Sequence, residues 1–380
     1  MAEMAEIPCM LDRRPHQFDI RKEGRKEGLW AGNEVMRSWE YWRLSVLRKH
    51  YPLHRCSWVM FHMHLNVEEI MGLSKVLIIG ATGGMGRYLT NASIKLGHPT
   101  FALVRSTTPS DPAKAELLKS FHDNGVTVLV GDVGNYASLL SALKQVDVVI
   151  AAVSEDQLGK QHNILEAANE AGTIKRFYPS EFGNEVDTFP VDNPISGAIF
   201  GTKQAFRRAV EKSSIPYTFV ASNAFNSYFV APLGQDPRLT APPRDGKLTI
   251  LGDGNAKAVF NDDADIATYT IRSVEDPRAE NKVLVISPKD NVASLNEVIA
   301  TWEKKIGHTF EKEFLDKEEI LKTIEELPFP LNIDRAVKYA ILVQGVQTGF
   351  ELDPSRQVEA TALYPDVNYT RLDQYFDRFV

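Results

Sequence analysis

The amino-acid sequence predicts an α/β fold, in which a doubly wound parallel sheet is followed by a smaller C-terminal α/β lobe. Short apolar runs rich in β-branched residues alternate with helix-length segments from residue 73 onward, and a glycine-rich turn follows the first run. Such runs are typical of strands buried on both faces of a sheet. Because helices of this length separate the strands, we expect right-handed crossovers and a parallel sheet.

The predicted strands and helices alternate up to about residue 222. The strands are Val76–Gly80, Thr100–Arg105, Val126–Gly131, Asp147–Val153, Arg176–Pro179 and Tyr217–Ala221. The helices are Met85–Leu96, Ala113–Asn124, Tyr136–Lys144, Gln157–Ala171 and Phe200–Ser213.

Three parts are predicted along the chain. Residues 1–72 contain seven of the eight methionines and four of the five tryptophans, and they lack strand-and-turn alternation. We predict a poorly ordered N-terminal extension over 1–72 and a dinucleotide-binding domain over 73–222. Residues 223–380 break into proline-rich turns, short strands and helices. They predict a mixed α/β lobe that covers a substrate at the carboxyl edge of the sheet.

The composition argues against several classes of function. The net charge of −7 disfavours an extended nucleic-acid-binding surface. No apolar run approaches the ~20 residues that a membrane-spanning helix requires. No histidine or cysteine spacing matches a zinc site, so no metal is predicted. The two cysteines, Cys9 and Cys56, lie outside the main body, which predicts a reducing, cytoplasmic location.

A glycine-rich turn after the first strand is the clearest functional signal. Gly80, Gly83 and Gly86 have the spacing G-x-x-G-x-x-G, which is related to the dinucleotide fingerprint of Rossmann-type domains. The first glycine permits a tight turn, the second lets the backbone approach a pyrophosphate, and the third lets the helix pack close to the strand. A glycine-rich turn that binds nothing is the alternative. The predicted cofactor contacts here are Gly80, Ala81, Thr82, Gly83, Gly84, Met85 and Gly86.

The end of the second strand indicates which dinucleotide is bound. Sites that prefer NAD usually carry a carboxylate there, whereas this chain has Arg105, with Lys114 opening the next helix. A guanidinium forms bidentate, charge-assisted bonds with a phosphate, so we predict NADP(H) rather than NAD(H). A solvated arginine at a strand end is the alternative. Asp132, after the third strand, reaches the adenine or caps the following helix, and the sequence does not decide between the two.

The chemistry is predicted to lie on the helix Phe200–Ser213. Four residues before Lys203 stands Ile199, so the Tyr-x-x-x-Lys pair of short-chain dehydrogenases is absent. Lys203 and Arg207 are one helical turn apart and share a face. Burial of Lys203 beside a guanidinium would lower its pKa and let it exchange protons with a substrate. From the spacing alone, a solvated charge on the helix is the simpler interpretation.

Several longer blocks resemble plant isoflavone reductase-like proteins. They are Gly80–Gly86, Leu96–Thr100, Lys175–Asn184, Lys203–Glu211, Ile215–Thr218 and Thr240–Pro243. This group lies within the NmrA-like atypical short-chain dehydrogenases and includes phenylcoumaran benzylic ether, pinoresinol–lariciresinol and isoflavone reductases. The resemblance covers about Ser74 to Val380. It implies an NADPH-dependent reductase with Lys203 as the catalytic lysine and with Arg105, Lys114 and Arg207 contacting NADPH.

Two departures from the family pattern bear on the substrate. Gly84 stands where relatives usually carry an aromatic residue, which leaves a barer and more flexible turn. Residues 345–351 read Gly-Val-Gln-Thr-Gly-Phe-Glu, whereas relatives often have an acid and an asparagine before Phe-Glu. The run Phe225–Val230 lines an aromatic-ring pocket or is simply core.

Two hypotheses about function follow. The first is a reductase that uses NADPH and Lys203 on a small aromatic substrate, either the benzylic ether of a lignan or neolignan or an isoflavone-like enone. The second is a non-catalytic, NADP(H)-sensing regulatory protein. Retention of Lys203 favours the enzyme. A homodimer is compatible with the sequence, which does not decide the oligomeric state.

Overall fold

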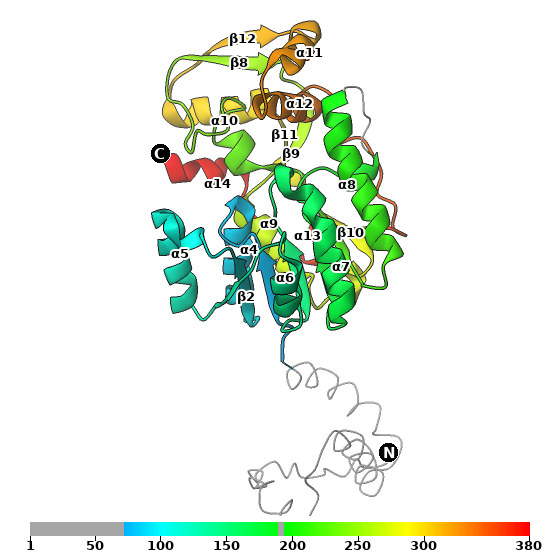
Figure 1. Cartoon of the computed structure of the whole chain (residues 1–380). Coiled ribbons are helices and arrows are strands. Elements are labelled where there is room, and N and C mark those ends of the chain that lie inside the picture. The colour runs from blue at the N-terminus through cyan, green and yellow to red at the C-terminus, as the bar shows by residue number, and fades with distance from the viewer. Residues whose placement is uncertain (1–71, 189–193) are drawn as a thin grey trace, which may run out of the picture. The chain divides into compact units, whose positions relative to one another are not determined.

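The computed structural model describes residues 72–188 and 194–380 (Figure 1). The predicted N-terminal extension lies outside these residues, apart from Gly72. Leu73–Val380 form one compact unit. In the part of the chain that the structure describes, no helix combines the length and hydropathy needed to cross a membrane.

A parallel five-stranded sheet forms the centre of this unit, in the order β3-β2-β1-β4-β5. Its strands are β1 (Val76–Ile79), β2 (Thr100–Val104), β3 (Thr127–Val130), β4 (Val148–Ala151) and β5 (Arg176–Tyr178). Every residue of β1 and β4 is buried, as expected for apolar strands that are covered on both faces. The chain order reverses between β1 and β4, which is where such sheets bind ligands.

Helices cover both faces of the sheet, so the predicted doubly wound fold is confirmed. They are α4 (Gly84–Lys95), α5 (Pro112–Asp123), α6 (Tyr136–Leu143), α7 (Gln161–Ala171), α8 (Pro194–Lys212) and α9 (Asp263–Arg272). One buried cluster joins the sheet to α4, α5 and α9, and a second joins it to α6, α7 and α8. Helix α8 begins at Pro194, earlier than predicted, with proline at the helix start where its missing N–H costs nothing.

Strands from the C-terminal half extend the sheet. A parallel bridge between Phe177 and Tyr217 joins β5 to β6 (Thr218–Ala221). Beyond β6 lie β10 (Lys282–Val285) and β13 (Gln357–Glu359), both parallel. The chain therefore leaves the sheet after residue 221 and later returns to it, and the division predicted near 222 stays a prediction.

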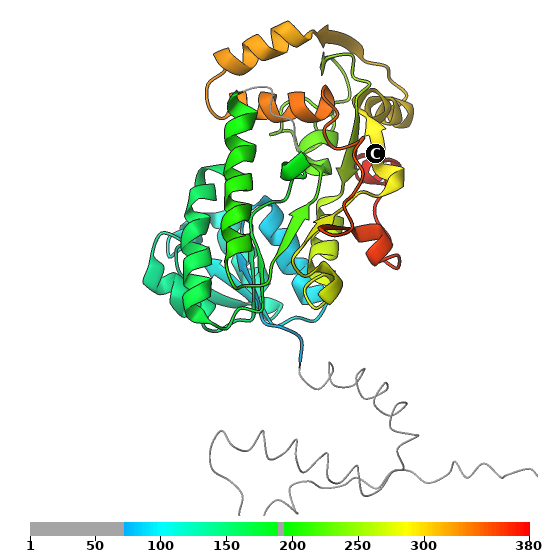
Figure 2. The same ribbon diagram turned by 90° about the vertical axis from the view of Figure 1, so that its right-hand side faces the viewer.

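Most of the remaining elements build the smaller lobe above the sheet (Figures 1 and 2). Its strands are β7 (Ala224–Phe225), β8 (Lys247–Leu251), β9 (Lys257–Asn261), β11 (Val292–Ser294) and β12 (Glu311–Leu315). Its helices are a π-helix (Asn226–Val230), α10 (Leu295–Ile306), α11 (Lys317–Glu326), α12 (Leu331–Leu342) and α14 (Leu372–Phe376). Helix α13 (Ala360–Leu363) instead follows β13 and packs into the buried cluster of the sheet. The lobe has its own apolar core around the fully buried Trp302.

A chain that starts at Gly72 is expected to keep its thermal midpoint and its cofactor affinity. The first strand begins at Val76, and Leu73–Val380 already form one compact unit. Differential scanning fluorimetry of the full chain and the shortened chain, with and without NADPH, checks this. A large fall in either quantity would show that residues before Gly72 contribute to the fold.

Candidate active site

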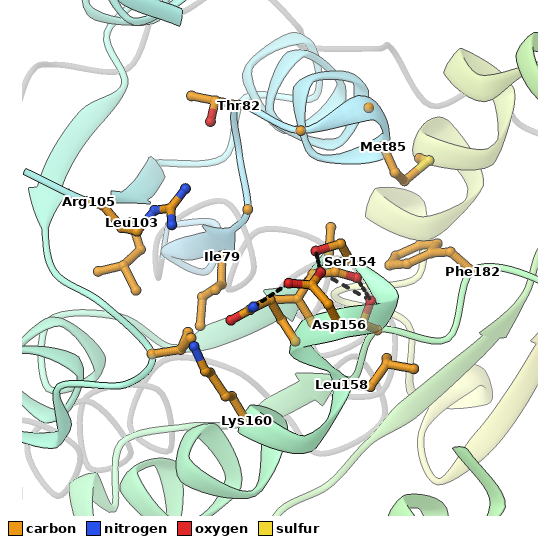
Figure 3. A pocket seen from close by; sticks show the side chains of 18 of the residues that line it. Ile79, Thr82, Met85, Leu103, Arg105, Ser154, Asp156, Leu158, Lys160 and Phe182 are labelled. Atoms are coloured by element: carbon orange, nitrogen blue, oxygen red, sulfur yellow. Dashed lines mark hydrogen bonds between the residues drawn. The ribbon is translucent and has the colours of Figure 1, made fainter. Parts of the chain in front are cut away.

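A cavity of about 650 Å³, which we call the main cavity, opens at the carboxyl ends of the central strands (Figure 3). Its volume is in the range of small-molecule and cofactor sites. The glycine turn after β1, the ends of β2, β3, β4 and β5, Lys203 of α8 and Phe225 of β7 all line it. Figure 3 shows Arg105 on one side and Met85 with Phe182 on the other, so the cavity has a basic end and an apolar end.

The glycine turn leaves no room for side chains at two positions. Gly80 has φ +87°, and a Cβ there would lie 2.2 Å from the Ala152 carbonyl oxygen. A Cβ on Gly86 would lie 2.0 Å from the Gly80 carbonyl oxygen. Gly83 is less constrained, because its nearest neighbour would be 3.2 Å away. The predicted roles of the first and third glycines, a tight turn and close packing of helix on strand, therefore match the geometry.

The N-terminus of α4 faces the main cavity and suits an anion. Gly83 is the N-cap and provides no side chain to bond the first turn, which also contains no acidic residue. The first helical bond is donated by the Arg87 N–H to the Gly83 carbonyl, so the preceding N–H groups of Gly84 and Met85 have no helical acceptor. Free N–H groups at the positive end of a helix dipole favour a phosphate.

Two cations lie at the basic end. Arg105 and Lys114 both line the main cavity, Arg105 after β2 and Lys114 in the first turns of α5. The Lys114 Nζ lies 3.4 Å from Asp111, which caps α5 by accepting from two backbone N–H groups. The N–H of Lys114 is the largest of the contacts that lower the pKa of Asp111. Arg105 is exposed.

Asp132 lines the main cavity but does not cap the following helix. Its carboxylate accepts from the Gly134 N–H at 2.6 Å, while Asn135 is the N-cap of α6. Of the two alternatives left open by the sequence, capping is therefore wrong. Contact with the adenine stays a prediction.

Lys203 reaches the main cavity from α8. Its Nζ donates to the backbone carbonyl of Glu181 at 2.6 Å, and its side chain is partly buried. Phe182 and Phe225 line the cavity, whereas the rest of the run Asn226–Val230 does not. Phe225 is thus the member of the aromatic run that faces the main cavity, and most of the others are core.

Arg207 does not reach the main cavity, so the predicted contact with NADPH is corrected. Its side chain is fully buried, and its Nε and Nη2 donate to Glu181 at 3.0 and 2.7 Å. Its Nη1 donates to Glu185 at 2.5 Å and to Asp187 at 3.2 Å. Burial alone would lower the pKa of Arg207, but the carboxylates outweigh burial and raise it. Four of the five N–H donors of this buried guanidinium bond carboxylates, and Arg207 does not line the cavity in which a cofactor phosphate would lie.

Sequence reasoning missed the turn after β4, which forms one wall of the main cavity. It contributes Ser154, Asp156, Gln157 and Lys160, and Ser154 donates to Asp156 at 2.5 Å. Their position after a central parallel strand was the available signal. Among the described residues, no group of three or more His, Cys, Asp or Glu side chains is arranged to hold a metal ion.

Known proteins resemble this chain in sequence and in structure over most of its length. The chain is 53% identical over 310 residues to a phenylcoumaran benzylic ether reductase of Ginkgo biloba, covering 82% of this chain and 100% of that protein. It is 52% identical over 307 residues to eugenol synthase 2 of Clarkia breweri, covering 81% and 99%. A leucoanthocyanidin reductase from Vitis vinifera, solved as a binary complex with NADPH, superposes with a TM-score of 0.74 at 32% identity, covering 80% and 98%.

A family model covers most of the chain. The model of the NmrA-like family matches residues 73–376, a range that includes every element from β1 to α14. The chain therefore belongs to the NmrA-like family.

Proposed function

We propose that this protein is an NADPH-dependent reductase of phenylpropanoid-type substrates. One observation supports the proposal: a single cavity is lined by a helix start suited to an anion, two cations suited to a 2′-phosphate, and a lysine beside apolar side chains. The names of the relatives, a benzylic ether reductase, a eugenol synthase and a leucoanthocyanidin reductase, support an oxidoreductase acting on aromatic compounds.

The residues present fit NADPH. Side chains at Gly80 and Gly86 would collide with the backbone, so the turn presents backbone without side chains at these positions. The first N–H groups of α4 would hold the pyrophosphate. Arg105 and Lys114 would hold the 2′-phosphate, for which a guanidinium supplies paired donors. When bound, NADPH supplies the hydride.

The apolar end would hold the substrate. Met85, Phe182 and Phe225 line it and would pack against an aromatic ring and exclude water. Lys203 has three donors, of which one is directed to the Glu181 carbonyl. Lys203 would hold or give a proton at a substrate oxygen, so it would serve as general acid or base. Whether the substrate is a benzylic ether or an enone depends on side chains at this end, where Gly84 leaves open space.

Arg105→Ala should weaken NADPH binding strongly and NADH binding little. Loss of a charge-assisted contact with the 2′-phosphate costs about 1.5–3 kcal/mol, and NADH lacks that phosphate. Isothermal titration with both cofactors measures the difference. Equal losses for both would place the 2′-phosphate away from Arg105.

The proposed activity is tested by NADPH consumption with product analysis across a panel of lignans, neolignans and isoflavones. Turnover of one class identifies the substrate. Tight NADPH binding without turnover of any member would instead support the NADP(H)-sensing alternative. Two further expectations come from the sequence: a cytoplasmic location, checked by fractionation, and a homodimer, checked by light scattering.

A further inference from the structure

Two cations of α8 hold the same residue from different sides. The Lys203 Nζ donates to the backbone carbonyl of Glu181 at 2.6 Å. Arg207, one helical turn further on, donates two bonds to the carboxylate of Glu181, at 3.0 and 2.7 Å. Lys203 and Glu181 line the main cavity, whereas Arg207 lies behind them.

Arg207 also bonds other residues of the loop that carries Glu181. We call this segment, residues 180–188, the Glu181 loop. The guanidinium bonds Glu185 and Asp187 of this loop and lies over the ring of Phe219, 4.8 Å from its centroid. The side chains of Arg207, Glu181 and Glu185 are 0%, 2% and 2% exposed. Taking carboxylates out of water is unfavourable unless good geometry compensates, so this arrangement is a costly way to anchor a loop.

The cavity side of the Glu181 loop is held in an unusual conformation. Phe182 has φ +22°, outside the regions that a bulky residue normally occupies. The loop is also bonded from other elements, by the Asn223 N–H to the Gly183 carbonyl at 2.9 Å and by the Gln347 amide to Asn184 at 2.6 Å. Backbone conformations of this kind persist only where the surroundings over-determine them.

We propose that Arg207 is a positioning residue for the reaction. Through Glu181 it fixes the carbonyl that accepts from the Lys203 Nζ, and it thereby sets the position of this Nζ in the main cavity. This inference rests on the proposed function, in which Lys203 exchanges a proton with substrate. It gives Arg207 a part in catalysis without contact with cofactor or substrate.

The test uses two variants of the ion pair between Arg207 and Glu181, which we call the tether, and one matched control. Glu181→Gln keeps the side-chain shape but removes the charge, and Arg207→Lys keeps the charge but cannot bond the carboxylates as a fork. Arg176→Lys is the control, because Arg176 is a buried arginine of β5 that bonds Glu280 at 2.9 Å and Thr218 at 3.1 Å and does not line the main cavity.

Both tether variants should lower the single-turnover rate at saturating NADPH by about 10- to 100-fold, because misplacing a reacting group by 1 Å costs up to that much. Their NADPH dissociation constants should change little. Arg176→Lys should lose thermal stability comparably and keep its rate. If the tether variants keep their rate, or lose no more of it than Arg176→Lys, the proposal is overturned.

A second measurement does not depend on turnover. The pH profile of Lys203 labelling by an amine-directed reagent, read by mass spectrometry of the Lys203 peptide, reports the environment of its Nζ. Glu181→Gln removes a neighbouring negative charge and should shift the profile to lower pH, whereas Arg176→Lys should leave it unchanged. If the unmodified chain turns over no substrate, the proposed function fails. An unshifted pH profile of Lys203 labelling in Glu181→Gln separately refutes the positioning role.

Discussion

Lys203→Ala is expected to abolish turnover while NADPH affinity stays within a few-fold of its original value. Lys203 lines the main cavity and its Nζ bonds the carbonyl of Glu181, the residue before Phe182, so its loss should remove a proton donor rather than a cofactor contact. General acid–base groups typically contribute ~10²–10⁴ in rate. Single-turnover hydride transfer at saturating NADPH, with and without Lys203, measures the effect.

Lys203→Arg separates proton transfer from simple charge. A guanidinium effectively cannot give up its proton, and its fork has a different shape, so this variant should fail as well. If Lys203 only held the cofactor, both variants would raise the NADPH dissociation constant and excess cofactor would restore the rate.

Near-equal rates in the variants would move the search for a proton donor to the edge of the sheet. Tyr178 is a poor candidate, because its side chain is fully buried, bonds Ser273 and does not line the main cavity. Burial also raises the pKa of Tyr178. Ser180 does line the cavity, although its hydroxyl donates to the Val153 carbonyl at 2.9 Å. Ser180 would therefore be the next residue to replace.

Gly86→Ala is expected to destroy NADPH binding and to lower stability. The added Cβ would lie 2.0 Å from the Gly80 carbonyl oxygen and 2.9 Å from the Ala81 Cα, so α4 must move away from β1. Overpacking of this kind costs about 1–3 kcal/mol or more, and the shift displaces the N–H groups that face the cavity. Thermal unfolding and NADPH titration of the variant check both effects.

Gly201→Ala is the matched control for Gly86→Ala. Gly201 is also a helical glycine, within α8, and a Cβ there would meet no described atom within 4 Å. Alanine at such a position is favoured over glycine by roughly 0.5–1 kcal/mol, so stability should hold or rise. NADPH binding that survives Gly86→Ala as well as it survives Gly201→Ala would show that the turn is not the cofactor cradle.

Local sequence patterns were sufficient for the central strands of the sheet and for the glycine turn. Val76–Ile79 and Val148–Ala151 are apolar throughout because both faces of a central parallel strand are covered, and this requirement is visible in the sequence. The glycine turn is equally local, since Gly80 and Gly86 are spaced by the geometry of one strand-to-helix turn.

Contacts between distant segments could not be predicted in this way. The return of β10 and β13 to the sheet depends on pairing with β6 across long stretches of chain, and β-pairing partners leave little trace in a single sequence. One local choice was also not decided by the sequence: Asp132 and Asn135 are both suitable caps by residue type, and the path of the turn selected Asn135.

Arg207 shows most clearly where the sequence is insufficient. Its spacing from Lys203 correctly placed both on one face of α8, and the family resemblance suggested a cofactor contact for it. Whether a cation on that face meets a phosphate or a carboxylate depends on the loop packed against it, and Glu181 and Glu185 reach Arg207 only when the chain folds back after β5. Helical periodicity specifies the direction of a side chain, whereas its charge partner is supplied by tertiary packing.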